Sequence, residues 1–166
     1  MEYLLDSNSL IDAYKKWYRP QVFNSVWTFL AANPTVKMTT FVYDEVKYPE
    51  SLAHWTTTAF KTDQIQPTEP SIQVYRRVMN WITTSTRWSP AGIAQWQSPY
   101  KADPWLIATA KINQQTIVTM DGNGHATMPD IGALSGKEPK INAVATQFGV
   151  TTIPIYVLLE QLHLSL

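Results

Sequence analysis

The chain has 166 residues, 45% of them hydrophobic, and its 13 basic residues balance its 13 acidic ones. This length and hydrophobicity argue against disorder, and the absence of cysteine excludes disulfides, thiolate catalysis and cysteine-based zinc sites. No stretch approaches the ~20 apolar residues of a membrane span, and the opening residues lack the basic segment of a secretion signal, so we expect a soluble cytoplasmic protein.

The first half of the chain alternates short apolar strands with helices. Tyr3–Leu5 is an apolar run that ends abruptly at Asp6, a pattern typical of a buried strand that meets a loop. Apolar residues then recur at helical spacing, and the second helix stops near Asn33–Pro34. The predicted elements are helices over residues 8–18, 21–32, 41–48 and 52–60, and a strand over 36–40.

The second half continues the alternation. We expect Ser71 to cap a helix over residues 72–82, and Asp103 to cap a helix that begins at Pro104, because proline is favoured in the first helical turn. The β-branched run Thr116–Met120 predicts a strand that ends before Asp121. The other predicted elements are helices over 90–96, 141–148 and 157–164, and a strand over 151–156.

Strands that alternate with helices in this way predict an α/β sandwich with a mainly parallel central sheet, and we expect residues 1–166 to form one domain. Sheets of this kind bind ligands in a crevice at the carboxyl ends of their strands. Asp6 and Asp121 each follow the carboxyl end of a predicted strand. They are therefore expected to lie close together.

Four acidic residues are candidates for one site. Taken singly, Asp6 and Asp121 could be turn formers, Asp103 a helix cap and Glu45 a surface charge. Carboxylates that converge repel one another unless a cation shares them, and hard oxygen ligands suit Mg²⁺ or Mn²⁺. Such a site hydrolyses phosphodiester bonds with a metal-activated water.

Other residues contribute less to this hypothesis. The histidines are far apart in the sequence and have no metal-ligand spacing, and only His125, in a glycine-flanked loop, is a candidate base or ligand. Basic residues can contact an RNA backbone, although each can also be an ordinary surface charge. The candidates are Lys15, Lys16, Arg19, Arg76, Arg77, Arg87 and Lys101.

Four segments in order, YLLDSNSLIDAY (3–14), FVYDEV (41–46), ADPWLIATAK (102–111) and TIVTMD (116–121), resemble the PIN-domain nucleases. The resemblance is greatest to bacterial members often regarded as toxins of toxin–antitoxin pairs. It implies a three-layer α/β/α fold, cleavage of RNA that depends on Mg²⁺ or Mn²⁺, and an antitoxin as partner. Homodimers are common among similar proteins.

The resemblance also implies roles for particular residues. The metal-binding acids of the family correspond to Asp6, to Glu45 rather than Asp44, and to Asp103, and the end of the following strand supplies Thr119 and Asp121. Asn8 matches a polar position that supports the first aspartate through hydrogen bonds.

The chain departs from the family pattern near residue 141. Relatives often carry Ile-Pro-Asp where this chain has Ile141-Asn142-Ala143. The fourth acid is then either Asp121 or Asp130, which lies in the long loop.

The sequence pattern leaves two other functions to consider. A phosphatase of the haloacid-dehalogenase kind also places an aspartate after its first strand, but it needs a second aspartate two residues later, where this chain has Asn8. A PIN-like module that binds RNA or protein without cutting it is the alternative from another class. A cluster of acids that binds nothing destabilises the fold through charge repulsion, so the presence of these acids argues against a non-catalytic module.

Overall fold

The computed structural model describes residues 1–124 and 127–165, and a five-stranded sheet in which every described pairing is parallel lies at its centre. The strand order is β3-β2-β1-β4-β5. β1 and β4 are buried along their whole length, as expected of central strands covered on both faces. The strands are β1 (Tyr3–Leu5), β2 (Val36–Thr39), β3 (Gln64–Ile65), β4 (Thr116–Val118) and β5 (Thr152–Ile153).

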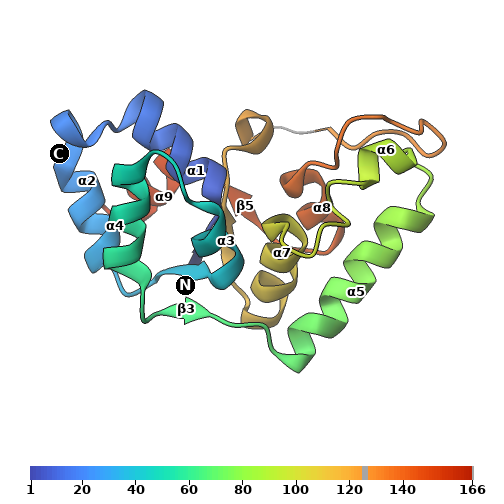
Figure 1. The fold of residues 1–166 in the computed structure, drawn as a ribbon, viewed down its shortest axis with the longest axis horizontal. Helices are drawn as coiled ribbons and strands as arrows, with labels where there is room; N and C mark the ends of the chain where they lie inside the picture. Colours follow the sequence, from blue (N-terminus) through green and yellow to red (C-terminus); the bar gives the residue numbers. More distant parts are fainter. Residues whose placement is uncertain (125–126, 166) are drawn as a thin grey trace.

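Helices cover both faces of this sheet. From β1 the chain moves outward to β3, and it then returns to add β4 and β5 on the other side of β1. Because crossovers between parallel strands are right-handed, the helices between β1 and β3 and the helices between β3 and β5 lie on opposite faces. Figure 1 shows the two groups: α1 (Ser7–Asp12), α2 (Pro20–Ala32), α4 (Glu50–Phe60) and α9 (Ile155–Gln161) at one end, and α5 (Glu69–Thr84), α6 (Pro90–Ile93), α7 (Ala102–Asn113) and α8 (Ile141–Gln147) at the other. α9 follows the last strand and is not part of a crossover.

The helix that carries Asp103 is largely buried. α7 buries Leu106, Ile107 and Ala108 completely, so it has no wholly polar face, as expected of a helix enclosed in a core. Its Trp105 ring stacks between Phe41 and Tyr75, at centroid distances of 4.7 and 4.1 Å. This stack ties α7 to α5 and to α3 (Thr40–Glu45), which fixes the first turn of α7 relative to Glu45.

The structure confirms the predicted alternation of strands and helices and corrects several boundaries. The predicted helix over 41–48 ends at Glu45, and the helix over 8–18 continues from α1 into a π-helical turn, Ala13–Trp17. The two-residue edge strand β3 was not predicted, because it is too short to show a pattern. The predicted strand over 151–156 ends at Ile153, since Pro154 suits the start of a helix and α9 begins directly after it.

Two predicted caps were wrong. Thr68, not Ser71, caps α5: the Ser71 hydroxyl instead accepts a hydrogen bond from the Thr68 N–H at 2.8 Å, as the third helical residue of a capping box. Lys101 occupies the N-cap position of α7, so Asp103 lies inside the first turn. The reason is tertiary, because Glu45 already accepts the hydrogen bond of the first helical N–H.

None of the helices in the described residues is both long enough and apolar enough to cross a membrane.

Candidate functional site

The candidate site lies where the chain direction reverses across the sheet. After β1 the chain turns toward one face, and after β4 it turns toward the other, so the loops that follow these adjacent strands diverge. Sheets of this kind bind ligands at such a switch point. Asp6 directly follows β1, and its N–H donates to the Val118 carbonyl of β4 at 2.9 Å. The two strand ends therefore hold Asp6 and Asp121 in one neighbourhood.

Asp6 is the buried centre of the site. Its residue surface is 2% exposed, and the Thr119 hydroxyl donates to its Oδ2 at 2.7 Å. Burial and the negative charges of Asp103, Glu45 and Asp121 raise the pKa of Asp6 to about 8, although the Thr119 hydrogen bond opposes them. The other three predicted acids thus lie close enough to Asp6 to raise its pKa.

Thr119 and Asn8 hold Asp6 in place. The Asn8 Oδ1 accepts a hydrogen bond from the Met120 N–H at 2.8 Å and lies 3.1 Å from the Thr119 hydroxyl. The Thr119 hydroxyl oxygen accepts a hydrogen bond from the Asp121 N–H at 3.1 Å. Its single proton is donated to Asp6, which is its shorter contact. Asn8 therefore supports Asp6 through the backbone and hydroxyl that follow β4.

Glu45 joins α3 to the start of α7. Its Oε1 accepts a hydrogen bond from the Ala102 N–H at 3.1 Å, and its Oε2 accepts one from the Ser7 hydroxyl at 2.8 Å. The neighbouring Asp44 instead contacts Lys47. Because Asp103 directly follows Ala102, the capping contact brings the carboxylates of Glu45 and Asp103 near each other.

Asp103 is also electrostatically strained. Burial raises its pKa to about 6 against the opposing charge of Lys101, and the charges of Glu45 and Asp121 add to the rise.

Asp121 plays a similar structural part for α8. Its Oδ2 accepts a hydrogen bond from the Ile141 N–H at 3.2 Å, and its backbone carbonyl accepts one from the Asn142 amide at 3.2 Å. Asn142 is buried, and Ala143, also buried, stands at the position of the acid in the expected Ile-Pro-Asp pattern. The rival fourth acid, Asp130, is exposed in the loop and is absent from the charges that shift Asp6 and Asp103.

Two lysines and a fifth acid complete the cluster. Lys101 Nζ lies 2.8 Å from Asp103 Oδ2 and 3.3 Å from Glu138, and Lys140 Nζ lies 2.9 Å from Asp121 Oδ1 and 3.8 Å from Glu138. Burial alone would lower the pKa of Lys101, but the charge and hydrogen bonds of Asp103 and Glu138 raise it.

Sequence reasoning proposed Lys101 only as a contact for RNA, and it did not propose Glu138 or Lys140. The one signal was the charged run Lys137-Glu138-Pro139-Lys140 directly before α8. Of the other basic candidates, Lys16 pairs with Asp12 and Arg87 donates to the Pro129 carbonyl. His125 lies outside the described residues.

The acids act on one another electrostatically, but in this structure they do not have the spacing of a complete set of metal ligands. Within residues 1–124 and 127–165, no three histidine, aspartate or glutamate side chains have the spacing to share one metal ion. The lysine ammonium groups offset part of the negative charge instead. The donor set still fits a hard divalent cation, because it consists of carboxylate oxygens and its buried member, Asp6, lacks a cationic partner among the described ion pairs.

Comparisons with known proteins bear on the fold and the family. No curated protein matches the chain. The crystal structure of FitAcB from Neisseria gonorrhoeae is similar with a TM-score of 0.50 and 13% identity, over 91% of this chain and 96% of that one. At this identity the likeness concerns the fold alone, and it confirms the predicted PIN-like α/β fold. The model of the family described as "Domain of unknown function (DUF4411)" matches residues 3–166, and the chain therefore belongs to the DUF4411 family.

Proposed function

We propose that this chain is an endoribonuclease that hydrolyses RNA phosphodiester bonds and depends on Mg²⁺ or Mn²⁺. One observation carries the proposal: a buried aspartate lies at the switch point of a parallel sheet, and three further carboxylates raise its pKa. A folded chain keeps such charge together at a cost in stability, so a function that uses the charge explains its presence.

The acids that would hold the cation are Asp6, Glu45, Asp103 and Asp121. When bound, a divalent cation supplies Lewis-acid activation of water and offsets the charge that develops on the phosphate. The chain itself orients the ligands. Thr119 fixes one Asp6 oxygen, and helix N–H groups fix one oxygen each of Glu45 and Asp121. The second oxygen of Glu45 accepts from the Ser7 hydroxyl and that of Asp121 pairs with Lys140, so a cation would share or replace these contacts.

Lys101 and Lys140 are proposed to bind the RNA backbone. Each ammonium group already contacts an acid of the site, at 2.8 and 2.9 Å. A phosphate oxygen can replace that carboxylate oxygen as the acceptor with little loss of electrostatic energy. The two lysines then hold the phosphates on either side of the scissile bond, which positions that bond over the acids.

Cleavage of RNA by the full chain tests this function. We expect single-stranded RNA to be cut with Mn²⁺ and not with EDTA. Asp6→Asn should lower the rate more than about 100-fold, the scale of losses when charge-stabilising groups of an active site are removed. Asp44→Asn, an exposed acid near Glu45, is the matched control and should cut normally. Full activity of the Asp6→Asn protein would refute the assignment.

We further propose that the chain is the toxin of a toxin–antitoxin pair, on the strength of the PIN-domain resemblance. A small helix-turn-helix reading frame next to this one would encode the antitoxin. Expression of the chain alone should then arrest growth, and co-expression of the neighbour should relieve the arrest. A homodimer, common among similar proteins, stays a prediction that sedimentation can test.

The alternative is a PIN-like module that binds RNA or protein without cutting. The lysine pairs favour it, because they offset charge in the cluster without any metal. Thermal unfolding separates the two functions. A nuclease of the proposed kind is stabilised by Mn²⁺, whereas an inert module shows no shift at millimolar metal.

A further inference from the structure

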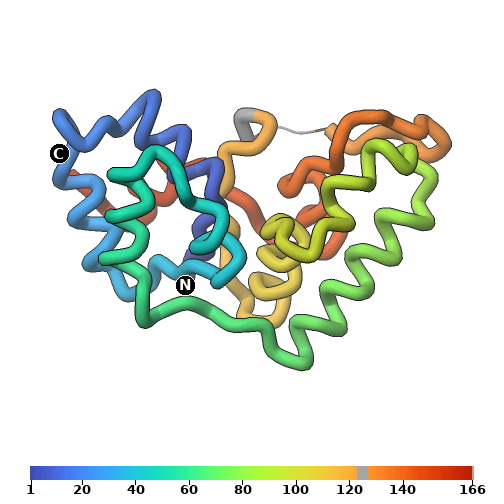
Figure 2. Tube along the Cα trace, viewed as in Figure 1, coloured from blue at the N-terminus to red at the C-terminus, as the bar shows by residue number. Residues whose placement is uncertain are grey.

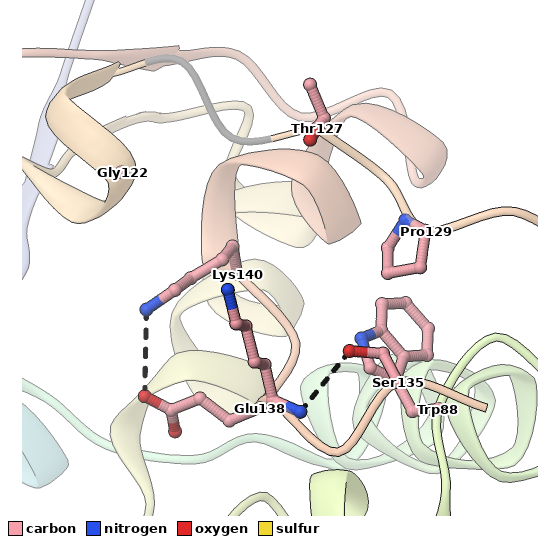
Figure 3. A pocket seen from close by; sticks show the side chains of 8 residues that line it. Trp88, Gly122, Thr127, Pro129, Ser135, Glu138 and Lys140 are labelled. Carbon is pink, nitrogen blue, oxygen red and sulfur yellow. Dashed lines mark hydrogen bonds and ion pairs between the residues drawn. The ribbon is translucent and has the colours of Figure 1, made fainter. Parts of the chain in front are cut away.

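A pocket of about 330 Å³ opens beside the acids. This volume is in the range of pockets that bind small molecules. Figure 3 shows that its lining includes Glu138 and Lys140, which also contact the acid cluster, so the pocket adjoins the proposed cleavage site. Its lining residues are Trp88, Gly122, Thr127, Pro129, Ser135, Lys137, Glu138 and Lys140.

The wall of this pocket is held by backbone contacts. The Ser135 N–H donates to the Arg87 carbonyl, and the Ser89 N–H donates to the Ser135 carbonyl, both at 2.9 Å. A Cβ on Gly92 would lie 2.4 Å from the Ser135 carbonyl oxygen and 2.7 Å from that of Lys137, so only glycine permits this approach. Figure 2 shows the long loop running beside α6. Backbone hydrogen bonds and close packing against Gly92 therefore hold this wall of the pocket in place.

The lining combines an apolar side with a cationic side. The half-buried Pro129 ring lies on one side in Figure 3 together with Trp88, of which 3% is exposed. Lys137 and Lys140 supply positive charge, and Lys137, unlike Lys140, has no carboxylate partner among the described residues. The Ser135 hydroxyl accepts from the Lys137 N–H at 3.2 Å and keeps its own proton to donate. This combination suits a ligand with a flat apolar part and an anionic part.

We propose that this pocket binds one nucleotide of an RNA strand, with its phosphate at Lys137 and its base against Trp88 and Pro129. That the nucleotide belongs to the strand being cut rests on the proposed function. Binding itself does not, because Lys137 and Pro129 have no hydrogen bond or ion pair with the four acids among the described residues.

The test is the binding of 5′-AMP and 5′-UMP to the full chain in EDTA, measured by ligand-observed NMR or calorimetry. We expect a nucleotide to bind more tightly than inorganic phosphate does. Lys137→Gln should weaken nucleotide binding at least about fivefold, the loss of one charge-assisted contact. Lys61→Gln, which makes the same change of charge on another element, should bind as the parent does.

A second variant probes the wall rather than the charge. Gly92→Ala removes no lining side chain but displaces the backbone at Ser135 and Lys137, so it should also weaken nucleotide binding while the protein stays folded by circular dichroism.

Equal binding by the Lys137→Gln and Lys61→Gln proteins would overturn the pocket proposal, as would phosphate binding as tight as that of nucleotides. If the chain cleaved RNA with Mn²⁺ but bound no nucleotide in EDTA, the pocket proposal would be rejected and the nuclease proposal would not be affected. If the chain bound nucleotides but did not cleave RNA, the nuclease proposal would be rejected and the pocket proposal would not be affected.

Discussion

At the scale of single residues, Asp6 dominates the electrostatics of the site. Its pKa rises from 3.8 to about 8, so the folded protein holds the Asp6 proton more tightly than the unfolded chain does. The resulting stabilisation is complete below pH ~4 and is lost as the pH rises through about 8. Asp103, whose pKa rises to about 6, acts in the same direction over a lower range.

The metal-free protein is therefore expected to lose stability between pH 5 and pH 9, by more than about 1 kcal/mol. Asp6→Asn, which imitates the protonated side chain, should flatten this slope. Urea unfolding in EDTA at several pH values measures both. A free energy of unfolding that rises with pH would contradict the electrostatic account.

Lys101 gives a second prediction at this scale. Its ammonium group and a divalent cation compete for the same acids, so Lys101→Gln should tighten Mn²⁺ binding by at least about threefold. The same change should lower metal-free stability by about 1–3 kcal/mol, because Asp103 loses its partner. Calorimetric titration and thermal unfolding check the two effects. Lys16→Gln, whose pair with Asp12 lies outside the site, is the control. Weaker Mn²⁺ binding by Lys101→Gln would rule out competition.

At the scale of elements, residues at the end of one element accept hydrogen bonds from the first N–H groups of a helix elsewhere in the chain. Glu45 at the end of α3 caps α7, and Asp121 caps α8. These contacts satisfy helix N–H groups that would otherwise lack acceptors, and they place carboxylates where helix dipoles favour negative charge. The same two residues thus stabilise the fold and build the site.

Two substitutions at Glu45 separate its role in stabilising the fold from its role in the site. Glu45→Ala removes the acceptor for the Ala102 N–H and should cost about 1 kcal/mol of stability together with cleavage activity. Glu45→Gln keeps an oxygen acceptor and should lose activity at nearly unchanged stability. Urea unfolding and RNA cleavage measure the two properties side by side, with Asp44→Ala as control. If Glu45→Gln cleaved RNA normally, Glu45 would serve only as a cap.

At the scale of the whole molecule, we expect metal binding to be coupled to folding. Millimolar Mn²⁺ should raise the melting temperature of the parent chain by several degrees, since a ligand of the native state stabilises it. Asp121→Asn should reduce the shift, and Asp130→Asn, in the exposed loop, should leave it unchanged. The opposite result would identify Asp130 as the fourth acid.

Much of the fold was readable from the sequence because its signals are local. Tyr3–Leu5 is an apolar run that ends at Asp6, and Thr116–Met120 is a β-branched run that ends at Asp121. The helical spacing of Tyr75, Val78 and Ile82 marks α5. The parallel sheet follows from the alternation of such segments. Asp6, Asp103 and Asp121 were also proposed from their places at element ends, and Glu45 from the PIN-domain resemblance. The structure brings the four close enough for the other three charges to raise the pKa of Asp6. Whether they bind metal stays a prediction.

Other features depended on contacts between distant residues. The wrong cap at Asp103 arose because Glu45, 57 positions from Ala102, supplies the acceptor that a local reading assigned to a neighbour. Lys140 and Glu138 come from a loop without periodicity, whose place is set by backbone hydrogen bonds to residues 86–89. The sequence by itself determined which elements form and which acids end them. Only the tertiary structure decided which cations join those acids, because ion pairing depends on distance in space and not along the chain.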